Sequence, residues 1–257
     1  MNVLIAQFAH ISPSSKVFDK YLNNAFKKHK DKKIDLIVLG DFVANKFFKE
    51  YRSKASLKRE FASQEKYFST LAQKYNTTII APLIECKQNK YYKSILIVDS
   101  TQSRFYRSSC LMDFIHWNER EFFDNDLKVK EPLVFKIANF NVSVIFGWEA
   151  HFDETFIALR KKGVDVLIIP TANTFSSNSR WINLLSVRSF LNNCFIVRVN
   201  RVGNYMDNNI EWKFYGESFI ALPDGNLGDM LGDKEGILVS EVSESMLNDI
   251  KNTWKFR

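Results

Sequence analysis

The chain has 257 residues, of which 46% are hydrophobic and 25% are charged, and its net charge is +7. These proportions are typical of an ordinary globular protein, and the 23 phenylalanines argue against intrinsic disorder. The lysines lie mainly in polar helical segments such as residues 27–33, with no helix-turn-helix, zinc-finger or RNA-recognition signature, so we expect a solvated basic face and no nucleic-acid partner.

The cysteines and the N-terminus exclude further classes of protein. Cys86, Cys110 and Cys194 are widely spaced, and only four histidines accompany them. This pattern argues against a disulfide framework and against a zinc site, so we expect neither a metal nor a cofactor. The first 15 residues lack the features of a signal peptide, and no apolar run is long enough to span a bilayer. The sequence therefore predicts a cytoplasmic protein without a membrane partner.

Apolar runs and amphipathic segments alternate along the chain. Because no repeat and no linker rich in glycine, proline or serine interrupts this order, it predicts one α/β domain over residues 1–257, with two sheets and outer helices. In chain order, strands are expected at 2–8, 34–40 and 77–85, as a hairpin of 93–100 with 105–109, as two strands within 133–147, and at 164–173 and 195–203. The segments 214–230 and 235–243 are expected to form a pair of strands split by a turn with a Pro-Asp-Gly signal at 223–225. Helices are expected at 14–31, 57–76, 152–163 and 179–193.

Polar and small residues follow three of these strands. Asp41 comes after the second strand, Ser108 and Cys110 end the hairpin, and Gly147 and Glu149 follow the apolar run VIF. In α/β folds the functional groups lie on loops just beyond the carboxyl ends of strands. These three loops are therefore the predicted place of a functional site.

The order and spacing of these motifs resemble the nitrilase (carbon-nitrogen hydrolase) superfamily over nearly the whole chain. The resemblance implies a four-layer αββα sandwich, paired through its helices into a homodimer. At the catalytic positions the matching segments are LIVLGDF, YRSSCL and GWE. In the supporting scaffold they are GVDVLIIPTAN, RSFLNNCFIVRVNRVG, FYGESFIALPDG and EGIL. Trp181 matches a tryptophan of the family's following helix, and Leu191 stands where the family usually has glutamate.

The catalytic set of the family is a glutamate base, a lysine and a cysteine nucleophile, and the resemblance places Asp41, Ser108 and Gly147 at these positions. Thiol-based amide hydrolysis needs a thiolate, a carboxylate that moves its proton, and a donor or cation for the oxyanion. Asp41 is one methylene shorter than glutamate, Ser108 carries no charge, and Gly147 has no side chain. The sequence therefore predicts that thiol-based hydrolysis has been lost.

Other residues of the predicted site match the family better. Glu119 stands where the family has an acidic residue between its lysine and its cysteine, and is a catalytic candidate. Trp148, Glu149 and His151 follow the nucleophile position and are candidate pocket-binding residues; the alternative is that they serve the scaffold through caps, turns and packing. A migrated nucleophile at Cys110 is disfavoured, because an isolated cysteine is more often inert core.

Three functions remain open from the sequence. The main hypothesis is a pseudoenzyme with a binding, regulatory or scaffold role, which takes a small amide, amine or carboxylate ligand or a protein partner. The alternative is an amidase-like hydrolase that activates water directly through Asp41 and Glu119, with Glu149, against a small linear amide or N-carbamoyl compound; without a cation it is expected to be slow. A purely structural partner would show an exposed apolar patch. An open pocket with converging carboxylates would favour binding or chemistry.

Overall fold

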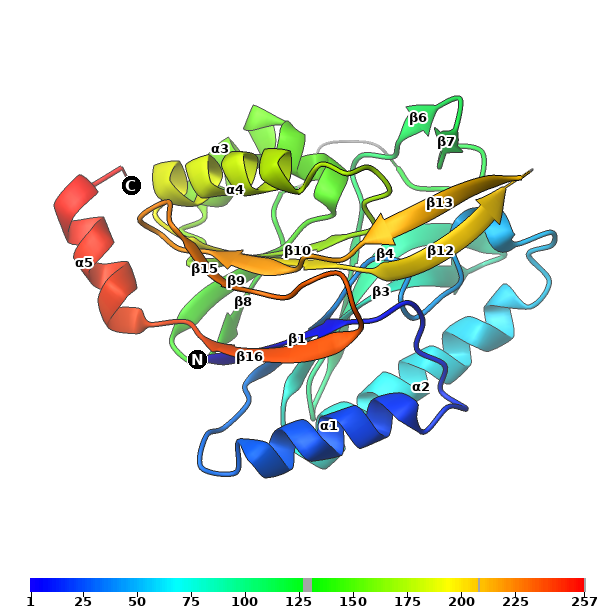
Figure 1. Cartoon of the computed structure of the whole chain (residues 1–257), viewed down its shortest axis with the longest axis horizontal. Coiled ribbons are helices and arrows are strands. Elements are labelled where there is room, and N and C mark those ends of the chain that lie inside the picture. The colour runs from blue at the N-terminus through cyan, green and yellow to red at the C-terminus, as the bar shows by residue number, and fades with distance from the viewer. Residues whose placement is uncertain (127–130, 208, 257) are drawn as a thin grey trace.

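Two six-stranded sheets lie face to face at the centre of the molecule, and helices cover both outer faces (Figure 1). The computed structural model describes residues 1–126, 131–207 and 209–256. The expected four-layer αββα sandwich is confirmed. No helix in the described part of the chain is both long and apolar enough to cross a membrane.

The first sheet has the strand order β16-β1-β2-β3-β4-β5. Its three central strands are parallel, and the flanking strands are antiparallel. Two helices, α1 and α2, cover its outer face (Figure 1). The bounds are β1 (Asn2–Gln7), β2 (Leu36–Leu39), β3 (Thr78–Lys87), β4 (Lys90–Val98), β5 (Ser103–Arg107), β16 (Gly236–Glu241), α1 (Val17–Lys28) and α2 (Leu57–Tyr75).

The second sheet has the order β15-β14-β11-β10-β9-β8, again with three parallel strands at its centre. Helices α3 and α4 cover its outer face (Figure 1). The bounds are β8 (Val134–Ile137), β9 (Phe140–Val144), β10 (Val166–Thr171), β11 (Phe195–Asn200), β14 (Phe219–Ala221), β15 (Leu227–Met230), α3 (Asp153–Lys161) and α4 (Asn178–Asn192).

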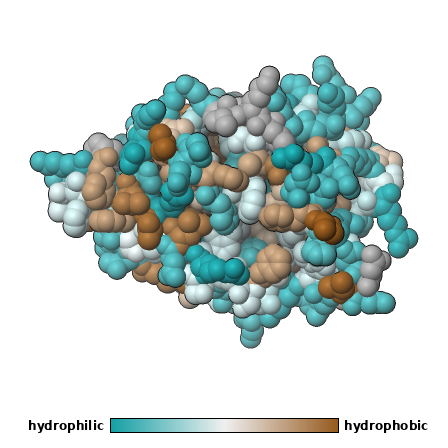
Figure 2. Space-filling model, turned by 90° about the horizontal axis from the view of Figure 1, so that it is seen from above, coloured by the Kyte–Doolittle hydropathy of each residue, from teal (hydrophilic) through white to brown (hydrophobic). Residues whose placement is uncertain are grey.

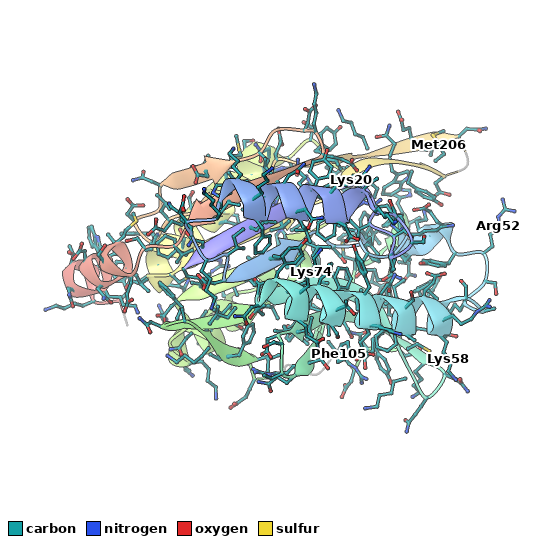
Figure 3. All side chains as sticks on the ribbon, turned by 90° about the horizontal axis from the view of Figure 1, so that it is seen from below. Lys20, Arg52, Lys58, Lys74, Phe105 and Met206 are labelled. Atoms are coloured by element: carbon teal, nitrogen blue, oxygen red, sulfur yellow. The ribbon has the colours of Figure 1, made fainter. Side chains whose placement is uncertain are left out.

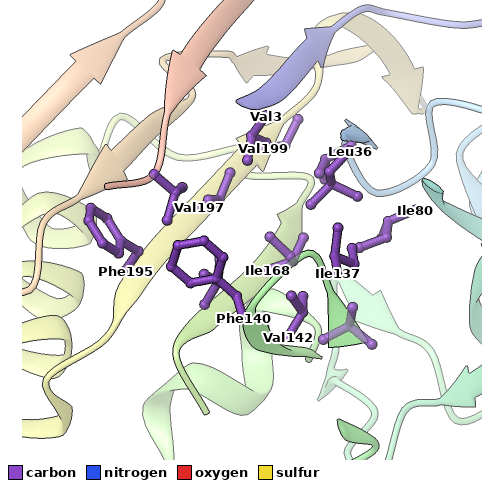
Figure 4. Close-up of a cluster of buried hydrophobic side chains, with 14 of the residues drawn as sticks. Val3, Leu36, Ile80, Ile137, Phe140, Val142, Ile168, Phe195, Val197 and Val199 are labelled. Carbon is purple, nitrogen blue, oxygen red and sulfur yellow. The ribbon is translucent and has the colours of Figure 1, made fainter. Parts of the chain in front are cut away.

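The main core lies between the two sheets. Alternate residues of a strand point to opposite faces, so Val3 and Ile5 of β1 face the second sheet while Leu4 faces α1 and α2. Figure 4 shows Val3 and Leu36 of the first sheet close to Val197 and Val199 of the second. The parallel strands at the centre of each sheet are covered on one face by helices and on the other by the second sheet, so they are apolar almost throughout.

Helices α1 and α2 lie side by side below the first sheet (Figure 3). The hydroxyl of Tyr67 donates a 2.7 Å hydrogen bond to Asp19, which joins the two helices. Lys20, Lys58 and Lys74 are exposed on these helices, so the predicted solvated basic face is present here.

Several elements were not expected from the sequence. The expected Pro-Asp-Gly turn at 223–225 separates β14 from β15, but the chain before it is also broken, because Gly216 and Glu217 both adopt positive φ angles. Two hairpins extend the molecule beyond the sandwich at the end where β2 and β10 finish, and a helix follows the last strand (Figure 1). These elements are β6 (Asp113–Phe114) with β7 (Trp117–Asn118), β12 (Val202–Asp207) with β13 (Ile210–Tyr215), the 3-10 turns η1 (Phe48–Glu50) and η2 (Gly147–His151), and α5 (Glu244–Trp254).

Candidate active site

Asp41 lies just beyond β2, on the floor of the main pocket. The chain reaches this point through Gly40, where a Cβ atom would come within 2.9 Å of the backbone nitrogen of Arg201, so the close approach needs glycine. The amide of Asp41 donates a 3.1 Å hydrogen bond to the carbonyl oxygen of Thr171, and its Oδ1 accepts one of 3.0 Å from the amide of Phe42. The carboxylate is therefore fixed where strands of the two sheets end together.

Lys93 provides a cation beside Asp41 that the sequence analysis did not anticipate. It shares its face of β4 with Ile95, which points between the sheets. Its Nζ lies 3.0 Å from Asp41 Oδ2 and pairs with Glu119 Oε1, and the side chain is only 4% exposed. The expectation that the pocket lacks a cation is therefore wrong.

Glu119 lies on the other side of Lys93 and is fully buried. Its Oε1 also accepts a 3.0 Å hydrogen bond from the indole Nε1 of Trp117, and its Oε2 accepts one of 3.1 Å from the amide of Met112. Glu119 does not line the pocket directly within the described part of the chain. Its carboxylate can therefore influence pocket chemistry through Lys93.

Burial sets the proton affinities of this cluster. It raises the pKa of Asp41 to about 6, although the ammonium of Lys93 opposes the rise. Burial alone lowers the pKa of Lys93, but attraction to Asp41 and Glu119 outweighs it and leaves that pKa above its ordinary value. At neutral pH the pocket floor therefore holds a charged Lys93 beside an ionised carboxylate that is more basic than an ordinary aspartate.

Ser108 and Cys110 lie on the loop after β5, and neither is among the described residues that line the pocket. Ser108 is fully buried, and its hydroxyl donates a 2.6 Å hydrogen bond to the carbonyl oxygen of Cys110. Burial and the nearby Glu149 carboxylate raise the pKa of the Cys110 thiol, which opposes formation of a thiolate. Ser108 thus fastens the loop, and the geometry offers Cys110 no route to the pocket.

Gly147 begins η2 and lies in the pocket wall. A Cβ atom built at this position would lie 2.6 Å from Cγ2 of Thr171, far inside normal van der Waals contact, and 3.4 Å from the ring of Trp181. Thr171 is held in place because its hydroxyl donates a 2.9 Å hydrogen bond to Asn200 Oδ1. The methyl group of Thr171 thus fills the space that the first side-chain atom of a nucleophile would need.

Trp148 and His151 line the pocket, as the sequence analysis expected. The pocket has a volume of about 410 Å³ and opens to solvent, a size suited to a small organic ligand. Seen from the side of α3 and α4, apolar side chains are exposed among hydrophilic ones on this face (Figure 2). Phe114 and Phe175, at 49% and 65% exposure, are two of the pocket residues that remain accessible.

Glu149 does not face the pocket, so its predicted pocket-binding role is wrong. It is 1% exposed, and its Oε1 accepts hydrogen bonds from the hydroxyl of Tyr106 and from the amide and hydroxyl of Ser109. Its Oε2 accepts a 2.7 Å hydrogen bond from the amide of Phe146. A carboxylate with four local donors joins the loop after β5 to η2 and has no free oxygen to offer a ligand.

Sequence reasoning missed two residues that shape the pocket floor, Lys93 and Thr171. A signal for Lys93 existed, because a lysine two positions before Ile95 shares a strand face with an apolar core residue. Thr171 gave no signal, since its effect depends on a distance to Gly147 that only the packed sheets determine. No group of three or more histidine, cysteine or acidic side chains in the described part of the chain is placed to hold a metal ion.

Comparison with proteins of known structure gives many neighbours with the same fold. A carbon-nitrogen hydrolase from Helicobacter pylori G27 superposes with a TM-score of 0.87, at 22% identity, over 100% of this chain and 94% of that one. Nit3 of Saccharomyces cerevisiae, a member of branch 10 of the nitrilase superfamily, superposes with a TM-score of 0.78, at 20% identity, over 99% and 94% of the two chains.

Curated relatives are enzymes that act on carbon-nitrogen bonds. An N-carbamoylputrescine amidase from Solanum lycopersicum is 29% identical over 199 residues, which cover 72% of this chain and 65% of that protein. A citrullinase from Francisella tularensis is 26% identical over 178 residues, which cover 66% and 59%. The chain thus spans less than two thirds of the length of these relatives. The family model for carbon-nitrogen hydrolases matches residues 9–252, nearly the whole chain, and the protein therefore belongs to the carbon-nitrogen hydrolase family.

Proposed function

We propose that the protein is a hydrolase of non-peptide carbon-nitrogen bonds, which cleaves a small amide or N-carbamoyl compound by direct activation of water. Its family membership supports the reaction class. The observation that carries the proposal is the position of Lys93, whose ammonium lies between Asp41 and Glu119 on the floor of an open pocket. A base and an oxyanion-stabilising cation are therefore both present.

The proposed reaction has two proton transfers through Asp41. The ionised carboxylate takes a proton from a water molecule as the water oxygen attacks the carbonyl carbon, and the carbonyl oxygen becomes an oxyanion. The ammonium of Lys93, whose side chain is only 4% exposed, stabilises that negative charge. Asp41 then gives the proton to the departing nitrogen as the C–N bond breaks, which releases an amine or ammonia and leaves a carboxylic or carbamic acid.

Glu119 maintains the charge of Lys93 in this scheme. Asp41 alternates between its ionised and protonated forms, so it cannot hold the ammonium charged throughout the reaction. Glu119, which is fully buried and also bonded to Trp117 and Met112, takes no part in these proton transfers and keeps its ion pair with Lys93. The lysine can therefore remain a cation while Asp41 carries the proton.

A binding role without catalysis is the second candidate, and a separate observation favours it. None of the described residues that line the pocket is a cysteine, and the Thr171 methyl occupies the space beside Gly147. A pocket of this kind can hold an amide ligand without forming a covalent intermediate. This reading keeps the pocket but assigns no turnover to it.

Ammonia or amine release from a panel of amides, nitriles and N-carbamoyl compounds separates the two candidates. We expect turnover by the purified protein, reduced at least about 100-fold in Asp41→Asn, because loss of a general base typically costs that much or more. Lys93→Met and Glu119→Gln should also lose activity, whereas Lys90→Met, an exposed lysine at the start of the same strand, should retain it.

Two results would contradict hydrolysis by this route. One is that no compound of the panel is hydrolysed although calorimetry detects binding of the same compounds, a result that would support the binding role. The other is turnover that survives Asp41→Asn unchanged, which would place the chemistry elsewhere.

A further inference from the structure

The pocket is unusually rich in aromatic side chains. The chain has five tryptophans, and four of them, Trp117, Trp148, Trp181 and Trp212, line this pocket. Phe114, Phe175, His116 and His151 add further rings to the lining. Eight of the nineteen described lining residues therefore carry a flat ring.

Most of these rings lie in two groups of contacting side chains. In the first group Phe114 packs edge-on to Trp148 at 5.2 Å between ring centres, and His151 lies 5.1 Å from Trp148 and 5.3 Å from Trp181. These residues come from β6, η2 and α4.

A second group joins Trp117 of β7 to Trp212 of β13, at 6.0 Å between ring centres. The β6–β7 hairpin contributes a ring to each group, through Phe114 and Trp117, and the β12–β13 hairpin contributes Trp212. A pocket lined with flat rings favours a ligand that is itself flat and apolar in its body, because such rings stack or meet edge to face.

The charges of the pocket decide between an aromatic ligand and a cationic one. Aromatic rings can also bind an ammonium group. The formally charged residues of the lining are Asp41, Lys93 and Arg180, and Lys93 is paired both with Asp41 and with the buried Glu119 behind it. Arg180 is exposed and has no acidic partner among the described residues. The unpaired charge of the lining is therefore the guanidinium of Arg180, which attracts a carboxylate and repels an ammonium placed beside it.

Two polar groups of the lining also lack partners. The indole Nε1 of Trp212 and the hydroxyl of Thr174 are buried without a hydrogen bond to any described residue. An indole N–H can only donate, so it needs an acceptor such as a carbonyl or carboxylate oxygen. A ligand with such oxygens would satisfy a donor that the protein leaves open.

We propose that the pocket recognises an amide or N-carbamoyl compound that carries an aromatic ring and a carboxylate. The ring packs against the aromatic side chains of the lining, the carboxylate faces the positive charge of Arg180, and the amide or carbamoyl group reaches the floor at Asp41 and Lys93. This inference rests on the proposed function only in placing an amide or carbamoyl group at the pocket floor. Binding of the aromatic ring and of the carboxylate does not require turnover.

Binding of four compounds, measured by calorimetry and by tryptophan fluorescence, tests the proposal. N-carbamoyl-phenylalanine has both features, 2-phenylethylurea lacks the carboxylate, N-carbamoyl-alanine lacks the ring, and N-carbamoylputrescine has a cation instead. We expect N-carbamoyl-phenylalanine to bind at least about ten-fold more tightly than each of the others. Fluorescence should change strongly, because four of the five tryptophans lie at the site.

Variants assign each preference to its residue. Trp148→Ala should weaken N-carbamoyl-phenylalanine about ten-fold and leave N-carbamoyl-alanine nearly unchanged, with Trp254→Ala, on α5 outside the pocket, as the control. Arg180→Gln should weaken N-carbamoyl-phenylalanine but not 2-phenylethylurea, with Arg160→Gln, an exposed arginine of α3, as the control. Circular dichroism checks that each variant is folded.

The outcomes separate this inference from the proposed function. Tight binding of N-carbamoyl-phenylalanine without hydrolysis would support the inference and contradict the hydrolase. Equal or tighter binding of N-carbamoylputrescine or N-carbamoyl-alanine, or no binding of any of the four, would overturn the inference even if another compound were hydrolysed.

Discussion

The amide of Ser108 donates a 3.0 Å hydrogen bond to the carbonyl oxygen of Lys93, so Ser108, the first residue after β5, continues the antiparallel register and lies opposite Lys93 of β4. Directly opposite residues of such strands point to the same face of the sheet, with Cβ atoms about 5 Å apart. The family resemblance assigns the lysine to position 108, and here a lysine reaches the same space from the adjacent strand. Lys93 therefore lies opposite the position where the resemblance expects a lysine.

The first prediction concerns the burial of this charge. Lys93→Ala should lower the free energy of unfolding by about 3–5 kcal/mol, because it leaves Asp41 and Glu119 buried without their counter-ion. Urea unfolding measures this loss. Lys90→Ala, at an exposed position of the same strand, should change stability by less than about 0.5 kcal/mol.

An exchange variant sharpens the test. Lys93→Ser combined with Ser108→Lys returns the lysine to the adjacent strand and should recover more than half of the stability lost in Lys93→Ser alone. No recovery in the double variant would contradict the view that the two positions are equivalent.

The sequence was sufficient to predict the sandwich, because its strands and helices have strong apolar patterns and ordinary lengths. The hairpins at the pocket were missed because their pairing depends on contacts with the rest of the fold. Within the site, Asp41, Trp148 and His151 were found because they follow strand ends directly. Lys93 was missed because it lies inside a strand, and such a position becomes functional only when distant loops bring carboxylates to it.

The second prediction concerns the space beside Gly147. Gly147→Cys alone should destabilise the protein by about 1–3 kcal/mol, because its Cβ would overlap the Thr171 methyl at 2.6 Å. Adding Thr171→Ser removes that methyl but keeps the hydroxyl that binds Asn200. The double variant should therefore regain most of the loss, as thermal unfolding would show.

The same pair of variants can be compared chemically. The thiol of the double variant should react with iodoacetamide faster than that of Gly147→Cys alone, because it has room to adopt a rotamer that faces the pocket. Equal stability and equal reactivity of the two variants would show that Thr171 imposes no constraint on position 147.

The third prediction follows from the raised pKa of Asp41. If Asp41 is the base, kcat/KM should rise with pH and level off above an apparent pKa of about 6, because the free protein must hold the carboxylate ionised. A rate profile across pH 4.5–8 on the best substrate of the panel measures this. A profile that is flat in this range would contradict Asp41 as the base.

The same pKa predicts the pH dependence of stability. The folded pKa lies above the ordinary value of 3.8, so the folded state binds the Asp41 proton more tightly than the unfolded state does. The stability from this group is therefore full below about pH 4 and is lost as the pH rises through 6, by about 3 kcal/mol. Asp41→Asn, which does not titrate, should lack this part of the pH dependence when urea unfolding is compared at pH 4 and 7.

The fourth prediction tests the structural role of Glu149. Glu149→Gln should destabilise the protein by at least about 2 kcal/mol, because the NH2 group that replaces one carboxylate oxygen can only donate, so the hydrogen bonds that this oxygen accepts from Tyr106 and Ser109 or from Phe146 are lost. Glu154→Gln, at an exposed position of α3, should be nearly neutral. In the folded protein at low temperature, Glu149→Gln should keep the ligand affinity of the wild type, since its carboxylate does not face the pocket. If Glu149→Gln lowered the ligand affinity without lowering the free energy of unfolding, Glu149 would be part of the ligand-binding site.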